Sequence, residues 1–146
     1  MNELYLSTAT AAATAAGKLL MQSMPAPVHH DQFDQPTTEQ DVASEMLIIK
    51  MLGEAFPEHG LLGEELGAKN QQAEYTWIID PIDGTNNYVD GRDTFSVSIG
   101  LAHHGEIILG VVYLPRRNEL FSATAGHGAF LTVDYETVDY ETPLIN

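Results

Sequence analysis

Two aspartates stand where a predicted strand gives way to a turn, and their type and spacing suit metal and phosphate chemistry. The stretch TWIIDPIDGTNN places Asp80 and Asp83 around Pro81, directly ahead of Gly84 and Thr85. Since proline cannot donate a ladder hydrogen bond, we expect the strand to end at Pro81. Carboxylate oxygens beside consecutive backbone N–H groups are the arrangement that a magnesium-assisted phosphate site needs.

The same residues also have a purely structural interpretation, because Asp-Pro and Asp-Gly are ordinary turn formers. Other carboxylates in the chain favour the metal site. Glu64 and Glu65 follow a glycine turn, and Asp41 lies in the first turn of a predicted helix. Carboxylates brought together raise one another's pKa and destabilise the fold unless cations or hydrogen bonds compensate. Asp41 alone is explained well enough by the positive end of the helix dipole.

Two adjacent histidine pairs are weaker candidates. His29 and His30, followed by Asp31, could bind a metal, although neighbouring histidines in a polar loop are more often simply solvated. His103 and His104 precede a glycine and are predicted to form a hairpin turn.

Helices are predicted to come first along the chain. The alanine-rich residues 1–24 form an amphipathic helix, which lacks the basic flank of a signal peptide and the apolar length of a membrane span. A second helix is predicted from Glu39 to Phe56, with Thr37 or Thr38 as its N-cap. Its apolar residues recur at helical spacing: Val42, Met46, Ile49, Leu52 and Phe56. Gln40, three residues after Thr37, would complete a capping box.

Strands are predicted to follow the helices. The run TWIID is apolar enough to be buried on both faces, and the run TFSVSIGLA alternates strictly between apolar and polar or small residues. Short turns then link EIILGVVY and LFSA into an antiparallel meander. Helices followed by strands indicate an α+β fold, a layered sandwich with the N-terminal helices packed on a largely antiparallel sheet.

The charge of the chain limits its partners. Its 146 residues carry 21 acidic and 6 basic side chains, for a formal net charge of −15. Such a field repels phosphate backbones and anionic lipids, so we expect neither nucleic acid nor a membrane as partner. The chain has no cysteine, which fits a reducing compartment, and we expect a cytoplasmic protein.

The motif GEE followed by DPIDGTNNY, with TTEQD upstream, resembles the inositol monophosphatase family of magnesium-dependent, lithium-sensitive phosphatases. Further segments along most of the chain are similar to that family: AAGKLL, FPEHGLLGEE, SVSIGLA, GVVYLP and LFSATAGHGAFL. The resemblance implies two or three Mg²⁺ ions per site. It also implies direct hydrolysis of a phosphate ester by water, without a phosphoenzyme.

The resemblance assigns roles to residues at matching positions. Glu64, Asp80 and the carbonyl of Ile82 would bind one metal, Asp80 and Asp83 a second, and Glu64 or Glu65 would help a weaker third. Thr85, paired with Asp41, would position and deprotonate the attacking water. The implied catalytic residues are Asp41, Glu65 and Thr85, and the implied substrate-binding residues are Asp83, Gly84, Thr85 and Asn86.

Family members continue well beyond this length. Their second half supplies another metal-binding aspartate within a WDxAA-like string, but the only tryptophan here, Trp77, is followed by Ile78. A lysine of the family is also replaced near His30. We therefore predict an N-terminal domain of the family over residues 1–131, with the second α/β half missing, and an irregular or disordered tail over residues 132–146.

The expected function is a magnesium-dependent phosphomonoesterase acting on inositol monophosphate. Other substrates within the class are fructose bisphosphate, a phosphoadenosine nucleotide and histidinol phosphate. A different class remains open: a catalytically weak or inactive module that binds divalent metal or a partner chain. Apolar surface left uncovered by the missing half favours self-association, and we expect a homo-oligomer, a dimer.

Overall fold

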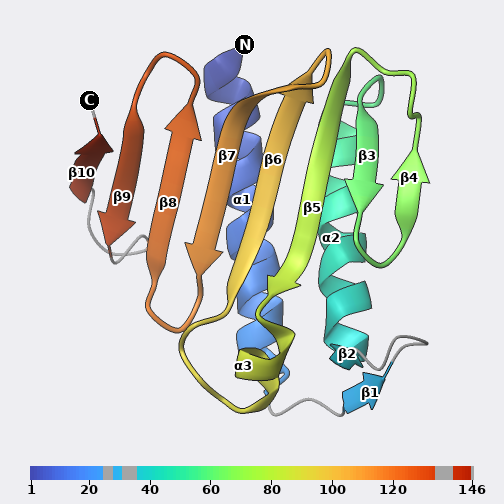
Figure 1. Cartoon of the computed structure of the whole chain (residues 1–146), viewed down its shortest axis with the longest axis vertical. Helices are drawn as coiled ribbons and strands as arrows, with labels where there is room; N and C mark the ends of the chain where they lie inside the picture. The colour runs from blue at the N-terminus through green and yellow to red at the C-terminus, as the bar shows by residue number, and fades with distance from the viewer. Residues whose placement is uncertain (25–27, 31–35, 134–139, 146) are drawn as a thin grey trace.

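The computed structural model describes residues 1–24, 28–30, 36–133 and 140–145. Two long helices, α1 (Asn2–Gln22) and α2 (Glu39–Ala55), lie side by side against one face of an eight-stranded sheet (Figure 1). A short helix, α3 (Thr85–Val89), follows the strand β5 (Tyr75–Asp83) at one end of the sheet. Among the residues described, no helix combines the length and apolar character needed to cross a membrane.

The sheet has the order β10-β9-β8-β7-β6-β5-β3-β4. Its strands are β3 (Gly60–Gly63), β4 (Gly67–Lys69), β5 (Tyr75–Asp83), β6 (Ser96–His103), β7 (Glu106–Leu114), β8 (Glu119–Thr124), β9 (Ala129–Val133) and β10 (Tyr140–Ile145). Two further short strands, β1 (Val28–His30) and β2 (Pro36–Thr38), pair separately. Neighbouring strands are antiparallel except for the parallel pair β3 and β5. The predicted α+β fold with helices on a largely antiparallel sheet is confirmed.

The helix α1 approaches the sheet closely because its buried face is made of small residues. Ala9, Ala12, Ala13 and Ala16 are fully buried. At Gly17 a Cβ atom would lie 2.5 Å from the Tyr113 ring on β7, so only glycine fits there. The predicted N-terminal helix is confirmed.

The apolar face predicted for TFSVSIGLA is also confirmed, although Ser96 on the opposite face is buried as well. Its apolar residues are all buried: Phe95, Val97, Ile99 and Leu101. On β5, however, the prediction of burial on both faces is wrong. Trp77 is fully buried, whereas Ile78, which points to the other face, is 39% exposed. The reason is that the described helices cover only one face of the sheet (Figure 1).

The buried face of α2 differs from the predicted one. Met46 is 58% exposed, whereas Ser44, Glu45, Ile48 and Leu52 are buried. The capping box joins Thr38 and Asp41 instead of Thr37 and Gln40. The face is rotated because polar residues near the start of α2 point inward, where they meet backbone groups and side chains of the candidate site.

The strand β5 does not end at Pro81, as predicted, but continues to Asp83. The register of β5 against β6 shifts between Asp80 and Asp83, and Pro81 lies fully buried within this irregular segment. A bulge tolerates proline because its residues leave the regular ladder.

At the end of the chain, the structure differs from the predicted irregular tail where it is described. Thr132 and Val133 complete β9, and β10 pairs with it antiparallel. The strand forms because the last residues include tyrosine, threonine and isoleucine, which favour extended backbone. Residues 134–139 and 146 lie outside the described part, and the division at residue 131 stays a prediction.

Candidate active site

Three segments that are distant in sequence meet at one end of β5. They are the start of α2, the turn after β3, and the passage from β5 into α3, all at the lower end of the sheet in Figure 1. The parallel pairing of β3 with β5 sets Gly63 opposite Ile79. The next residues along the two strands are Glu64 and Asp80, so this register brings their carboxyl groups together.

The carboxyl groups of Glu64 and Asp80 interact and shift each other's pKa. A hydrogen bond to Asp80 raises the pKa of Glu64 to about 7, and burial and the charges of Asp80, Asp41 and Asp83 act in the same direction. The pKa of Asp80 is also raised, first by burial and then by the charges of Asp83 and Asp41, against hydrogen bonds from Glu64 and the Ile82 backbone. The carboxylates therefore form one electrostatic unit.

This unit fits a divalent cation. Oδ1 of Asp80 is buried and has no hydrogen-bond partner within the described part of the chain. An unpaired buried carboxylate oxygen is costly, and a hard cation satisfies it. Protonation of Glu64, whose pKa is raised, lowers the repulsion among the carboxylates as a bound cation would. Oxygen-only ligands of this kind are typical of magnesium sites.

Asp41 has two functions in the structure. Its Oδ2 accepts hydrogen bonds from the Thr38 backbone N–H at 2.8 Å and from the Thr38 hydroxyl at 2.5 Å, which cap α2. Its Oδ1 accepts a hydrogen bond from the Thr85 hydroxyl at 3.2 Å. Asp41 is only 2% exposed, so the helix cap fixes a buried carboxylate that points at Thr85.

Gly84 turns the chain from β5 into α3. Its φ of 86° and ψ of 49° are left-handed, and a Cβ atom there would lie 3.2 Å from the Thr94 carbonyl oxygen. Glycine is the residue that adopts this conformation without steric cost. The turn places Thr85 at the first position of α3, where its hydroxyl lies within 3.3 Å of the Ile82 carbonyl as well as near Asp41.

The remaining predicted residues lie around these groups. Asp83 is exposed, pairs with Ser96 in the ladder, and acts through its charge on Glu64 and Asp80. Asn86 is exposed in the first turn of α3. The roles assigned to these residues by the family resemblance stay predictions.

Sequence reasoning missed Glu45. This glutamate is fully buried on α2, and its carboxylate accepts hydrogen bonds from the backbone N–H groups of Glu65 at 3.0 Å and Leu66 at 2.5 Å. A Cβ atom at Gly63 would lie 2.5 Å from the Glu45 carboxyl carbon, so this glycine makes room for it. Glu45 thus holds the turn that carries Glu64. The available signal was its position one helical turn after Asp41.

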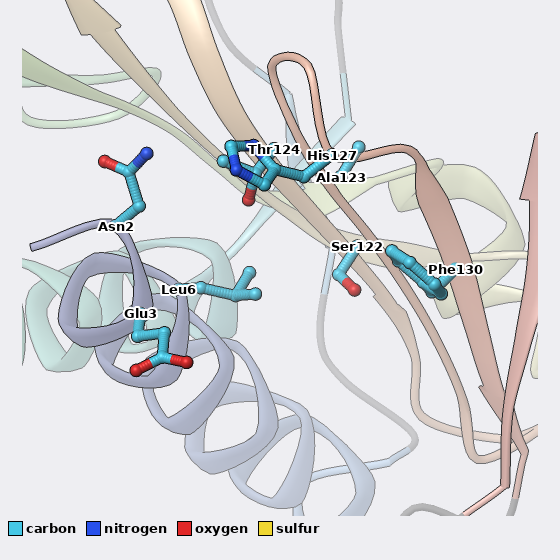
Figure 2. Close-up of a pocket in the computed structure, with 8 residues that line it drawn as sticks. All are labelled: Asn2, Glu3, Leu6, Ser122, Ala123, Thr124, His127 and Phe130. Atoms are coloured by element: carbon cyan, nitrogen blue, oxygen red, sulfur yellow. The ribbon is translucent and has the colours of Figure 1, made fainter. Parts of the chain in front are cut away.

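A separate cavity of about 280 Å³ lies away from these residues, between the start of α1 and the strands β8 and β9 (Figure 2). Leu6 and Phe130 line it, together with the exposed ring of His127. None of the predicted site residues is among its lining residues. The other metal hypothesis, at His29, His30 and Asp31, falls on side chains outside the described ones.

Comparisons with known proteins agree on one family. The model of the inositol monophosphatase family matches residues 1–142. The chain is 37% identical over 132 residues to a protein of Aquifex aeolicus named fructose-1,6-bisphosphatase/inositol-1-monophosphatase, a match that covers 87% of this chain and 50% of the relative. It is 35% identical over 132 residues to a putative Nus factor SuhB of Neisseria meningitidis, covering 87% and 51%.

The fold leads to the same family. The solved structure of an inositol monophosphatase from Anabaena superimposes with a TM-score of 0.77 at 41% identity, over 90% of this chain and 48% of that one. The chain thus spans about half the length of the relatives it matches. On the family match and these similarities, the chain belongs to the inositol monophosphatase family.

Proposed function

We propose that this chain contributes the metal-binding half of the active site of a magnesium-dependent phosphomonoesterase. The proposed substrate is inositol monophosphate or a similarly small phosphate ester. The observation that carries the proposal is the meeting of Glu64, Asp80 and Asp41 beside Thr85, with a pKa of Glu64 raised to about 7 by its neighbours. Acidic groups are held together in this way where a cation compensates them.

The proposed ligands are Glu64, Asp80, Asp83 and the carbonyl of Ile82, which would hold two or three Mg²⁺ ions, with Glu65 near the third. When bound, magnesium lowers the pKa of a water molecule towards neutrality and offsets the charge of the phosphate. The family's sensitivity to lithium is part of the same proposal.

The side chains beside this ligand set supply the proton path. The Thr85 hydroxyl already donates to Oδ1 of Asp41, so it can accept a proton from water while passing its own to the carboxylate. The capping hydrogen bonds from Thr38 leave Oδ1 of Asp41 for this purpose. Backbone N–H groups of Gly84 and Thr85, with Asp83 and Asn86 nearby, would receive the substrate.

We expect the choice among small phosphate esters to depend on residues outside the metal-binding half of the site. Fructose bisphosphate, a phosphoadenosine nucleotide and histidinol phosphate therefore stay alternative substrates. The net charge of −15 supports small substrates over nucleic acid. A cytoplasmic location and a homodimer complete the proposal.

A second candidate is a module that binds divalent metal and a protein partner without turnover. One observation favours it: a relative of the chain is named a putative Nus factor. In such a module the carboxylate cluster would still bind a cation.

Release of inorganic phosphate from inositol monophosphate tests the two candidates. The purified chain is assayed with and without millimolar magnesium, beside Asp80→Asn as a matched control. Release that needs both magnesium and Asp80 supports the phosphatase. A folded chain that binds magnesium by calorimetry and releases no phosphate would instead support the non-catalytic module.

A further inference from the structure

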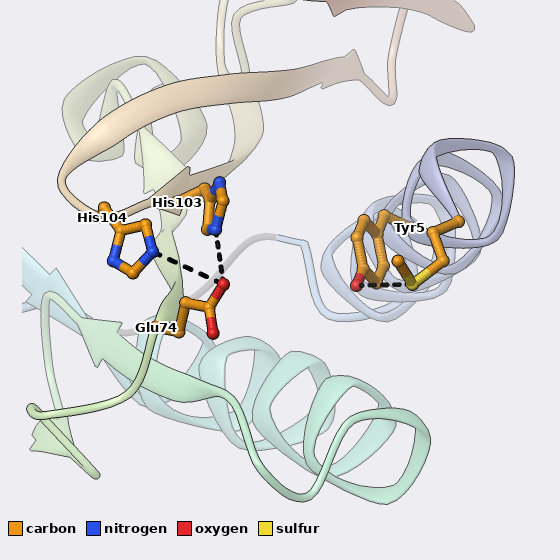
Figure 3. A network of polar contacts seen from close by, with 5 residues as sticks. Tyr5, Glu74, His103 and His104 are labelled. Carbon is orange, nitrogen blue, oxygen red and sulfur yellow. Dashed lines mark hydrogen bonds and ion pairs between the residues drawn. The ribbon is translucent and has the colours of Figure 1, made fainter.

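A second group of metal-ligating side chains lies at the opposite end of β5 from the carboxylate site. Glu74 directly precedes β5, and His103 and His104 lie where β6 turns into β7 (Figure 3). Asp80 is six residues further along the chain than Glu74, which corresponds to about 20 Å of extended strand. The two groups are therefore separate sites.

Three ligand atoms converge in this group. Nε2 of His103 lies 2.7 Å and Nε2 of His104 lies 3.5 Å from the same Glu74 oxygen, Oε1. One ligand atom from each of the three residues falls within 4.8 Å of the other two. Ligands bound tetrahedrally at about 2.0–2.1 Å from a zinc ion are about 3.3 Å apart. Small side-chain adjustments therefore suffice to place an ion among them.

The backbone fixes this convergence. Tyr75 pairs with His103 across the β5 and β6 ladder, and the His104 N–H donates to the Glu74 carbonyl at 2.9 Å. The ring of His103 stacks on the ring of Tyr75 with centroids 4.3 Å apart and an interplanar angle of 10°. His104 and Gly105 are the two left-handed residues of the hairpin turn, with φ values of 48° and 86°. The predicted hairpin is confirmed, and it carries both imidazoles to one carboxylate.

We propose that Glu74, His103 and His104 form a binding site for a borderline transition-metal dication such as Zn²⁺. Imidazole nitrogens and a carboxylate oxygen suit Zn²⁺, whereas Mg²⁺ prefers oxygen ligands alone. The group is open to solvent: the side chains of His103, Glu74 and His104 are 34%, 57% and 70% exposed, so water can complete the coordination. A bound ion would link the start of β5, through Glu74, to the turn between β6 and β7, through His103 and His104.

The test is a zinc titration of the purified chain in excess magnesium, followed by calorimetry and by the nitrogen resonances of the histidine rings. We expect one saturable site, with shifts at His103 and His104. His103→Ala and His104→Ala should each weaken zinc binding by at least about tenfold. Zinc should also raise the melting temperature of the wild-type chain and not that of His104→Ala.

Three matched variants keep the proposal falsifiable. His127→Ala removes an exposed histidine outside the group, and His29→Ala with His30→Ala removes the other adjacent pair. Both should bind zinc as tightly as wild type, and so should Asp80→Asn. Unchanged affinity in His103→Ala and His104→Ala, no saturable binding at all, or loss of binding in one of the three controls would overturn the proposal. None of these outcomes depends on phosphatase activity.

Discussion

The hydroxyl of Thr85 donates a hydrogen bond to Oδ1 of Asp41 at 3.2 Å, although 44 residues separate the two in sequence. The other oxygen of Asp41 is held by the N-cap residue Thr38, so the carboxylate has no freedom to turn away. A helix cap and a proposed proton relay thus depend on one side chain.

Replacing Thr85 separates proton transfer from metal binding. Thr85→Ala removes the hydroxyl between water and Asp41, so the rate of magnesium-dependent phosphate release should fall about a hundredfold or more. Magnesium affinity, measured by calorimetry, should change little, because the proposed ligands are untouched. Thr85→Ser should restore most of the rate. A collapse of metal affinity with an unchanged residual rate would mean that Thr85 does not position water.

Removing one carboxylate should stabilise the metal-free chain at high pH. The pKa of Glu64 is raised from 4.5 to about 7 in the native chain. Between pH 4.5 and pH 7, native Glu64 therefore binds more protons than Glu64 of the unfolded chain. The free energy of unfolding therefore falls as pH rises through this window. Asp80→Asn removes a charge that raises the pKa of Glu64, so the fall should become shallower.

Urea unfolding at about pH 5 and about pH 8, in the presence of a chelator, measures this difference. Magnesium should stabilise wild type and not Asp80→Asn. If Asp80→Asn is less stable than wild type at the higher pH, the carboxylates do not repel one another as inferred.

Glu45 should matter for metal binding although it is not a proposed ligand. Glu45→Gln keeps the shape but can accept with one oxygen only, so one of the N–H groups of Glu65 and Leu66 loses its partner. We expect a loss of about 1–3 kcal/mol in the free energy of unfolding and weaker magnesium binding. Gly63→Ala should likewise lower the free energy of unfolding and weaken magnesium binding, since its Cβ atom would lie 2.5 Å from the Glu45 carboxyl carbon.

The control for that series is Gly53→Ala, whose Cβ atom would lie 3.8 Å from a Leu61 methyl group, in ordinary van der Waals contact. It should bind magnesium as wild type does. Equal magnesium affinity in Glu45→Gln and wild type would show that the turn keeps its shape without the buried carboxylate.

Two glycines with similar backbone conformations offer a matched pair. Gly84 and Gly126 have φ values of 86° and 77°, but a Cβ atom would meet the Thr94 carbonyl only at Gly84. Each substitution by alanine should cost about 1–2 kcal/mol for the left-handed backbone. Only Gly84→Ala should also abolish stabilisation by magnesium, as followed by thermal unfolding. If Gly126→Ala also lost its stabilisation by magnesium, the turn at Gly84 would have no specific role in the cation site.

The local part of the site was predictable from the sequence. The string DPIDGT carries its own turn chemistry, so Gly84, Thr85 and both aspartates could be placed at a strand end. The α+β order and the alternation in β6 followed from periodicity in the same way. These features depend on residues that are neighbours along the chain.

What sequence reasoning missed depends on pairing between distant segments. Glu45 interrupts the apolar pattern of α2 because it binds the backbone of a turn 20 residues away. Pro81 remains within β5 because a bulge forms around it. Glu74 meets His103 and His104 only through the register of β5 against β6.

The sheet itself implies an order of assembly. The strands from β5 to β9 follow one another in antiparallel pairs, so their contacts are mostly between residues close in sequence. The acidic site instead joins segments near residues 41, 64 and 80, and such non-local contacts carry the larger loop-closure entropy. We expect the meander to form before the transition state and the site after it. A cation bound there would then act mainly by slowing unfolding, with little effect on the rate of folding.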